Sequence, residues 1–295
     1  TVRATGSGSL ALGGNLDVPG AVLVESGAQL NCDNTILTGG SFGLAPGGTL
    51  GIGAADGITS SGLSGNIRTT TRNFDAAASY VFNGSSAQVT GSGFPATVQN
   101  LTVANSAGLT YAGTLTVNGN CTIDGGAVFQ LSGTLNGSLI VNGMLACAGT
   151  SIGGLALDAT PDLAGTLSLQ VNKTGATNDQ ITRVGGTLAY GGTLAVTNVN
   201  GTLAAGDQFT LFPAGSYSGA FTAFDLPALT TGLNWYTGNL TNNGTILVNQ
   251  KPAGGSHSFT TRTNLPLVLS MAKLLAGDGD PDGNPLSIAG VAAAS

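Results

Sequence analysis

Pairs of apolar residues separated by a single residue recur along this chain at a fixed spacing. In the first run the pairs begin at Leu10, Leu16, Val22, Leu30, Ile36, Phe42 and Leu50, in steps of 6, 6 and 8 residues that then repeat. In the second run they begin at Leu101, Leu109, Leu115, Cys121, Phe129, Leu135 and Val141, in steps of 8, 6, 6, 8, 6 and 6. Both runs repeat every 20 residues, and no other feature of the sequence restricts the fold as strongly.

Three short strands in every 20 residues predict a parallel β-solenoid. In each pair the two apolar side chains point to one face of a strand, and the middle residue points to the other. Stacked coils align the inward side chains in columns and pair the backbone of each coil with that of the next, at a spacing of about 4.8 Å. The predicted fold is therefore all-β, with a right-handed, three-sided solenoid of 20-residue coils as its main part.

The same spacing predicts which side chains face the interior. The bends between pairs are rich in glycine and include Asn-Gly steps, which adopt positive φ at little steric cost. The middle residues Ala11, Thr102 and Thr122 should face outward. The residues expected to point inward are Leu10, Leu12, Leu30, Cys32, Leu50, Leu101, Val103, Cys121 and Ile123.

Two stretches depart from the repeat. Within a solenoid of residues 1–155, residues 66–95 are predicted to form a hairpin-like interruption, because an apolar strand at 79–82 is followed by Asn83-Gly84 and a polar strand. Arg68 and Arg72 would cover this hairpin or pair with Asp75. Residues 156–250 contain longer strands and more aromatic residues, so we expect a wide-coil end or a small β-sandwich that caps the solenoid.

Composition narrows the class of protein. Only 7% of the residues are charged and the net charge is −6, so the chain lacks the clustered basic face that nucleic-acid binding requires. A single Glu and three Lys indicate a low-charge, extracellular surface. No apolar run approaches the roughly 18 residues of a membrane span. Cys32, Cys121 and Cys147 all lie in apolar pairs, which favours buried, unpaired thiols over a bridge between two of them.

The positions of the ionisable residues predict a chain without catalytic activity. Glycoside hydrolysis needs two carboxylates about 5–10 Å apart. The only histidine, His257, lies just after a linker. A polysaccharide-active β-helix enzyme and carbohydrate binding through Tyr217, Trp235 or Tyr236 remain alternatives. The acidic residues before position 160 are not spaced to stack in pairs, and they are Asp17, Glu25, Asp33, Asp56, Asp75, Asp124 and Asp158.

Several motifs after position 50 resemble known bacterial proteins. The stretches 191–197 (GGTLAVT), 203–209 (LAAGDQF), 232–235 (GLNW) and 243–248 (NGTILV) resemble the C-terminal part of autotransporter-associated β-strand repeat proteins. Residues 80–84 (YVFNG) and 88–91 (QVTG) are similar to segments of other large secreted β-repeat proteins. This resemblance implies a large exported protein, attached to a surface or embedded in a matrix, and it carries over no catalytic residue.

A different module is expected at the C-terminal end. Residues 251–256 read as a linker. Residues 274–286 (LLAGDGDPDGNPL) resemble the start of bacterial cadherin-like or immunoglobulin-like tandem domains, so 257–295 would be a partial module of this kind. Such a domain needs about 100 residues. The carboxylates of Asp278, Asp280 and Asp282 with the amide of Asn284 predict a calcium site, the alternative being a solvated Asp-Gly turn.

Together these patterns predict a secreted, non-catalytic structural subunit of a bacterial extracellular or cell-surface assembly. Apolar strands at 265–270 and 286–288 cannot be buried by so short a module, so we expect the chain to polymerise head-to-tail through them. The alternatives are a chain cut by truncation and the stalk of a large adhesin that binds carbohydrate or surfaces. Expected partners are further copies of the chain and cell-surface polysaccharide, with no nucleic acid and no membrane span.

Overall fold

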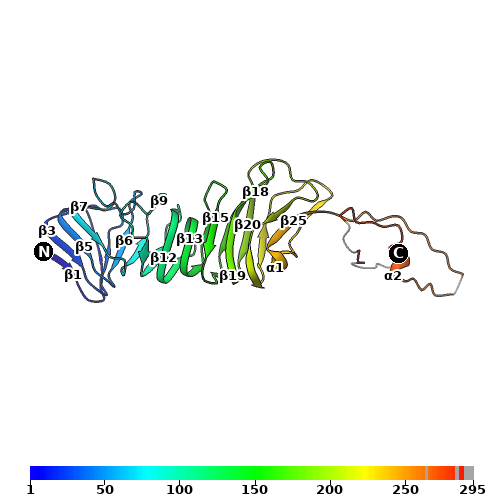
Figure 1. Cartoon of the computed structure of the whole chain (residues 1–295), viewed down its shortest axis with the longest axis horizontal. Coiled ribbons are helices and arrows are strands. Elements are labelled where there is room, and N and C mark those ends of the chain that lie inside the picture. Colours follow the sequence, from blue (N-terminus) through cyan, green and yellow to red (C-terminus); the bar gives the residue numbers. More distant parts are fainter. Residues whose placement is uncertain (263–264, 283–285, 289–295) are drawn as a thin grey trace.

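The computed structural model describes residues 1–262, 265–282 and 286–288 as an elongated stack of strands (Figure 1). The N-terminus lies at one end of the stack, and the C-terminal segment extends beyond the other end. Strands make up 49% of the chain and helices 3%, and the strands pair mainly in parallel between successive coils. The expected β-solenoid is therefore confirmed at the level of an all-β, parallel fold.

The strands follow the chain without large crossovers. The first half contains β1 (Val2–Ala4), β2 (Ser9–Ala11), β3 (Leu16–Val24), β4 (Gln29–Asn31), β5 (Leu37–Leu44), β6 (Thr49–Ile52), β7 (Ile67–Phe74), β8 (Ser79–Phe82), β9 (Gln88–Val89), β10 (Thr97–Val98), β11 (Asn100–Val103), β12 (Leu109–Ile123) and β13 (Val128–Val141). The second half contains β14 (Met144–Cys147), β15 (Gly154–Leu157), β16 (Asp162–Leu163), β17 (Thr166–Asn172), β18 (Thr177–Asn178), β19 (Gln180–Tyr190), β20 (Thr193–Asn198), β21 (Gln208–Thr210), β22 (Ala214–Gly219), β23 (Ala223–Asp225), β24 (Leu233–Tyr236) and β25 (Thr245–Gln250). Two short helices, α1 (Leu240–Asn243) and α2 (Met271–Leu274), complete the described elements.

The 20-residue interval in the sequence is the distance along the chain between neighbouring coils. Leu10 lies opposite Leu30, and Leu30 lies opposite Leu50. In the second run Leu109 lies opposite Phe129. Because residues 20 apart in the sequence lie opposite each other on neighbouring parallel strands, each apolar pair extends the column formed by the pair before it.

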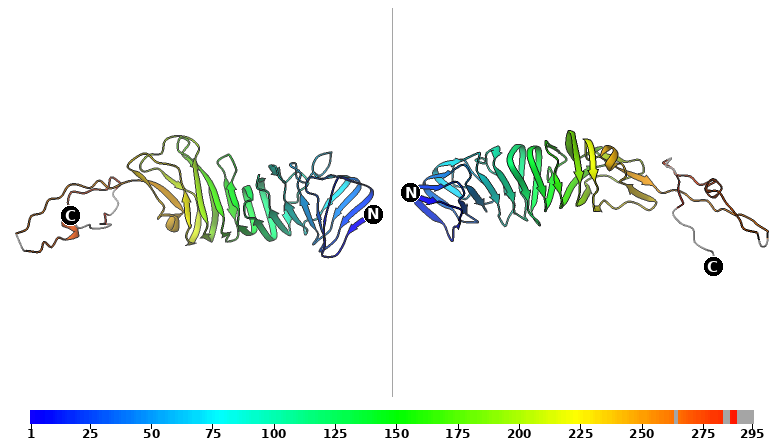
Figure 2. Two further views of the ribbon diagram at one scale, coloured as in Figure 1. Left: turned by 180° about the vertical axis from the view of Figure 1, so that it is seen from behind. Right: turned by 90° about the horizontal axis from the view of Figure 1, so that it is seen from below.

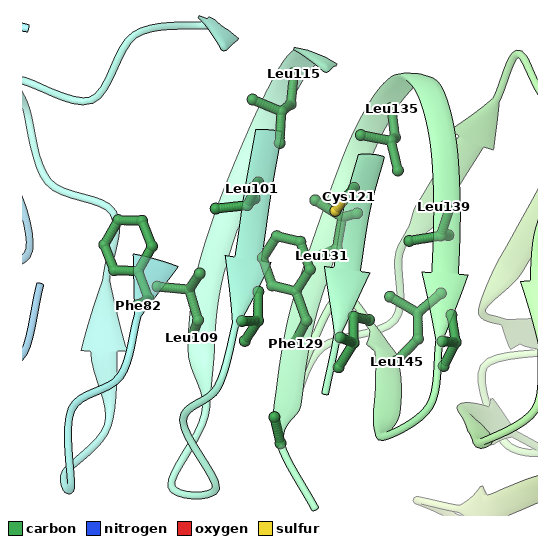
Figure 3. Packing of buried hydrophobic residues seen from close by; sticks show 14 of the residues in the cluster. Phe82, Leu101, Leu109, Leu115, Cys121, Phe129, Leu131, Leu135, Leu139 and Leu145 are labelled. Atoms are coloured by element: carbon green, nitrogen blue, oxygen red, sulfur yellow. The ribbon is translucent and has the colours of Figure 1, made fainter. Parts of the chain in front are cut away.

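Most of the side chains that were expected to face inward do so. Leu30, Cys32, Leu50, Leu101, Val103, Cys121 and Ile123 are all at most 2% exposed. Figure 3 shows how Leu101, Leu109, Cys121 and Phe129 gather between the strands. The middle residue Ala11 is exposed, and Thr102 and Thr122 are half-buried.

The expectation was wrong at a few positions. Leu10 is 45% exposed and Leu12 only half-buried, because the first coil has a neighbouring coil on one side alone. Leu37 rather than Ile36 points inward at the start of β5. At the end of β13, Leu139 and Val141 lie opposite Cys121 and Ile123, so the inward pair begins at Leu139, since the bend of β13 is shorter than that of β12.

The predicted hairpin within residues 66–95 is not formed. β8 pairs in parallel with β6 and β11, and β9 pairs in parallel with β12. Asn83-Gly84 is therefore a bend between two sides of a coil, because the buried Tyr80 and Phe82 continue the inward columns. This coil spans 30 residues, with Leu50 opposite Tyr80, whereas the coils on either side of it span 20 and 21, and the additional residues form the loop 53–66 before β7.

The two arginines of this region hold the loop 53–66 in place. Arg72 donates hydrogen bonds to the carbonyl and the hydroxyl oxygen of Thr59 and to the carbonyl oxygen of Gly62. Arg68 Nε donates to the carbonyl oxygen of Gly65 at 2.9 Å. Partial burial and the neighbouring charge of Arg68 lower the pKa of Arg72. The arginines thus satisfy loop carbonyls instead of covering a hairpin or pairing with Asp75.

The buried side-chain amide of Asn66 fills the corner beside this loop. Asn66 is 2% exposed, and its Nδ2 donates to the carbonyl oxygens of Asp33 at 2.8 Å and Thr35 at 2.7 Å. Its Oδ1 accepts from the backbone N–H groups of Gly53 at 3.0 Å and Ala54 at 2.9 Å. One side chain thus joins three segments of chain, and all four of its hydrogen-bonding positions are used.

Glycine is required where two long strands turn a corner one above the other. Gly113 in β12 and Gly133 in β13 are opposite each other, with φ of +130° and +99°. A Cβ atom on Gly133 would lie 2.3 Å from the carbonyl oxygen of Gly113. Gly133 therefore admits no side chain, and the positive φ at both glycines lets each strand continue from one side of the coil to the next.

The coils widen toward the C-terminal end. Met144 lies opposite Thr166, Thr166 opposite Thr193, and Thr193 opposite Ala223, so the interval grows from 22 to 27 and then 30 residues. Tyr190 fills the wider interior and packs against Phe212 and Phe221 at ring distances of 5.3 and 4.7 Å. Parallel pairing between coils thus continues as far as β23, apart from the local antiparallel pair of β17 and β18, and β21, β25 and β24 form an antiparallel sheet.

The described part of residues 257–295 forms no strand. Leu265 is 58% exposed and Val268 is 89% exposed, and residues 265–270 and 286–288 adopt no regular structure. The strands expected there are absent because so short a segment supplies no second layer to cover them. None of the helices in the described ranges is long and apolar enough to cross a membrane.

Candidate interaction sites at the two ends of the solenoid

The first coil forms one end of the stack and presents strands that are paired on one side. β1 pairs with β3 and β2 pairs with β4, while the first part of β3 pairs with β5. We call residues 2–4, 9–11 and 16–18 the first-coil edge. Val2 and Leu10 are 41% and 45% exposed at this edge. Its apolar side chains and outward backbone groups make it a template for pairing with another strand.

The backbone of β1 shows which groups point away from the solenoid. The N–H of Glu25 donates to the carbonyl oxygen of Ala4 at 3.0 Å, so the backbone groups of Ala4 face β3. Because these groups alternate in direction along a parallel strand, those of Arg3 point to the free side of the edge. The side chain of Arg3 forms an ion pair with Glu25 across the two coils.

A long loop projects from the opposite end of the molecule. We call residues 255–262 and 265–278 the C-terminal loop, and Figure 2 shows that it extends beyond the last coils in both views. Ala253 and Gly279 exchange two backbone hydrogen bonds of 2.9 and 3.3 Å at its base. Along the loop, Leu265, Leu267 and Val268 are 58%, 46% and 89% exposed.

The acidic residues that predicted a calcium site lie at the base of this loop. Asp278 Oδ1 accepts from the N–H of Gly255 at 2.6 Å and contacts His257 Nε2 at 2.9 Å. The bond from Gly255, with the contact from His257, lowers the pKa of Asp278. Asp282 accepts from the N–H of Gln250, while Asp280 Oδ1 accepts from the N–H of Asp282 at 2.9 Å.

The observed arrangement does not gather the predicted calcium ligands. Each of the three carboxylates meets a different backbone group, and Asn284 lies outside the described residues. Among the residues that the structure describes, no group of three or more His, Cys, Asp or Glu side chains is placed to hold a metal ion. In this geometry Asp278 and Asp282 close the base of the loop, and calcium binding stays a prediction.

The aromatic residues considered for carbohydrate stacking divide into two groups. Trp235 is half-buried and donates from Nε1 to the carbonyl oxygen of Pro227 at 2.8 Å. Tyr217 donates to the carbonyl oxygen of Phe212 at 2.9 Å and stacks on Tyr190. Both rings therefore serve the core. Tyr236 is 47% exposed and remains available for an external contact.

A second exposed aromatic ring, that of Phe224, was not singled out by the sequence. Phe224 is 45% exposed and borders a cavity of about 210 Å³ that is also lined by Tyr190, Phe221 and Leu240. Phe224 is the middle residue of β23, in the last wide coil, and is left partly uncovered there. In the sequence Phe224 lies between Ala223 and Asp225, which gives no sign of its exposure.

The larger surface grooves contain few charged groups. A groove of about 450 Å³ over β1, β3, β5 and β7 is lined by Arg3, Arg72 and neutral residues. A second, of about 600 Å³, is lined by neutral residues of 210–217 and 241–243. Neither is lined by the pair of carboxylates that glycoside hydrolysis requires.

One buried carboxylate stands apart from the surface. Asp179 is fully buried and accepts backbone hydrogen bonds from Gly153 and Gln170, both at 2.7 Å. Burial raises its pKa to about 6, although the two backbone hydrogen bonds act to lower it. The side chain links the loop before β15 to β17, and no spacing in the sequence identified it.

The three cysteine thiols are buried as expected.

Asp179 should make stability depend on pH. Because its folded-state pKa lies above the ordinary value, the folded chain binds more protons between pH 4 and 6, so stability is lost as the pH rises through this range. We expect the unfolding free energy of the wild type to rise by about 1–3 kcal/mol between pH 7 and pH 4, relative to that of Asp179→Asn. Denaturant titrations at several pH values measure this difference, with the exposed Asp225→Asn as the control. A pH-independent difference between wild type and Asp179→Asn would contradict it.

The sequence was compared with protein-family models and with curated proteins. No protein-family model matches the chain, and no curated protein matches it.

Proposed function

We propose that this chain is a non-catalytic structural subunit of a bacterial extracellular or cell-surface assembly, and that it polymerises head-to-tail. The observation that carries the proposal is the difference between its two ends. One end presents the first-coil edge, with Val2 and Leu10 exposed, and the other presents the C-terminal loop, with Leu265 and Val268 exposed. A contact between two different surfaces does not close on itself, so it builds a filament.

The proposed shape of the subunit is a right-handed, three-sided solenoid with a cap at its C-terminal end. The long strands β5, β12 and β13 each contain a bend, and the first-coil edge consists of three segments, which supports three sides. The antiparallel sheet β21-β25-β24 ends the parallel stacking. Tyr190 Oη donates to the carbonyl oxygen of Leu240 in α1 at 2.9 Å and ties this cap to the last coils.

The cap makes the two ends of the subunit different from each other. Antiparallel pairing of β25 with β21 and β24 stops the addition of further parallel coils, so growth there depends on the C-terminal loop. The low proportion of charged residues, 7%, suits close lateral packing within a fibre, a sheath or a matrix. The resemblance to autotransporter-associated repeat proteins supports a secreted, surface-located assembly.

A second candidate function is the stalk of an adhesin that binds carbohydrate. The exposed rings of Phe224 and Tyr236 at the C-terminal end favour it, since aromatic faces stack on sugars. In this alternative the purified chain stays monomeric and binds cell-surface polysaccharide. Electron microscopy of the purified chain therefore separates the two candidates.

Removal of residues 255–295 tests the polymerisation. We expect the full chain to form filaments and the shortened chain to remain monomeric in electron micrographs and in sedimentation. The thermal unfolding of the solenoid should be nearly unchanged, because the loop covers none of its core. Filaments of the same yield and appearance from the shortened chain would place the joint elsewhere.

A further inference from the structure

The columns of inward side chains end at β1 without a covering residue. Val2 lies opposite Val22, which lies opposite Phe42, and Ala4 lies opposite Val24 in the next column. Val22, Val24 and Phe42 are at most 5% exposed, whereas Val2 is 41% exposed. One more parallel strand with apolar residues at alternate positions would continue both columns at this end.

The C-terminal loop contains a stretch with this pattern. Residues 265–269 read Leu-Pro-Leu-Val-Leu, so that Leu265, Leu267 and Leu269 share one face in an extended conformation. The stretch has no strand partner within the described chain and ends before Ser270, whose side chain caps α2. It lies at the opposite end of the molecule from β1 (Figure 1), as a head-to-tail joint requires.

The proline at position 266 agrees with one orientation of this strand. If Leu265 lies opposite Val2 and Leu267 opposite Ala4, then Pro266 lies opposite Arg3. The N–H of Arg3 donates to the carbonyl oxygen of Leu265, and the N–H of Leu267 donates to the carbonyl oxygen of Arg3. The backbone nitrogen of Pro266 points away from β1, where no donor is needed. With the opposite face turned inward, this nitrogen would face β1 and one hydrogen bond would be lost.

We propose that residues 265–267 of one copy add to β1 of the next copy as a parallel strand, with Leu265 and Leu267 covering Val2 and Ala4. This inference rests on the proposed polymerisation and names its joint. The added strand places Pro266 on the new edge and blocks further pairing there, so each joint takes a single strand. The partner is a second copy of this chain.

A pair of cysteine variants tests the alignment. In Ala4→Cys/Leu267→Cys the two residues face each other between copies, at the Cα separation of neighbouring strands, which a disulfide can bridge. In the matched control Ala4→Cys/Val268→Cys the second cysteine points to the opposite face. The native cysteines interfere little, because burial raises the pKa of each thiol to about 12. Mild oxidation of filaments should give a ladder of covalent multimers only with the first pair.

The outcomes separate this inference from the proposed function. Filaments without the ladder, or an equal ladder from the control pair, would overturn the strand addition and leave polymerisation standing. If the wild-type chain forms no filaments, the proposed function and the joint both fail. As a second measurement, Leu265→Ser/Leu267→Ser should reduce filament yield at least tenfold, whereas Val184→Ser, at a position that is 83% exposed on the solenoid, should not.

Discussion

Asn66→Ala is expected to lower the free energy of unfolding by about 3–5 kcal/mol, one of the largest losses available to a single substitution in this chain. The substitution removes four hydrogen bonds, to Asp33, Thr35, Gly53 and Ala54, from a side chain that is 2% exposed. The backbone groups left behind are poorly reached by water, so each keeps much of its desolvation cost.

Denaturant titration followed by circular dichroism measures this loss. Asn34→Ala is the matched control, because Asn34 is exposed, and we expect a change within about 0.5 kcal/mol. Asn66→Asp provides a second variant. Its carboxylate still accepts from Gly53 and Ala54, but it repels the carbonyl oxygens of Asp33 and Thr35, so it should not restore stability at pH 7. Wild-type stability in either variant would show that the corner is held by other contacts.

Phe129→Ala should cost about 3–5 kcal/mol and should also divide the unfolding transition. The ring of Phe129 is fully buried between Leu109 in the preceding coil and Leu145 in the following one. Each coil of a solenoid contacts only its neighbours, so a cavity in the middle of the stack weakens the coupling between its two halves.

Calorimetry of the variant should therefore show two resolved unfolding transitions, whereas the wild type should show a single transition for the whole stack. Phe224→Ala is the control, because Phe224 is 45% exposed at the end of the stack, and it should cost less than about 1 kcal/mol. A single transition at the wild-type temperature for Phe129→Ala would contradict the description of Phe129 as a link in the core.

Local spacing determined most of the solenoid. The 20-residue repeat identified the parallel all-β fold and the inward positions of Leu30, Leu50 and Cys121, because stacked coils in register place each residue over its equivalent in the next coil. The repeat did not predict the strand pairing where the coils change length. Asn-Gly steps occur in hairpin turns and in coil bends alike, so the residue types at 79–89 alone could not distinguish the two. In the folded chain neither Asn83 nor Gly84 has the positive φ of a type I′ hairpin turn.

The tertiary structure decided what depends on neighbours distant in the sequence. Leu10 and Leu30 occupy equivalent positions in the repeat, yet only Leu30 is covered, because a coil lies on both of its sides. The four partners of Asn66 come from two other segments of the chain, and the partners of Asp179 lie 26 and 9 residues away from it, so neither buried side chain has a local signature. The carboxylates near position 280 share a spacing with calcium loops, but in the folded chain they meet separate backbone groups, because the direction of a side chain is set by the path of the chain around it.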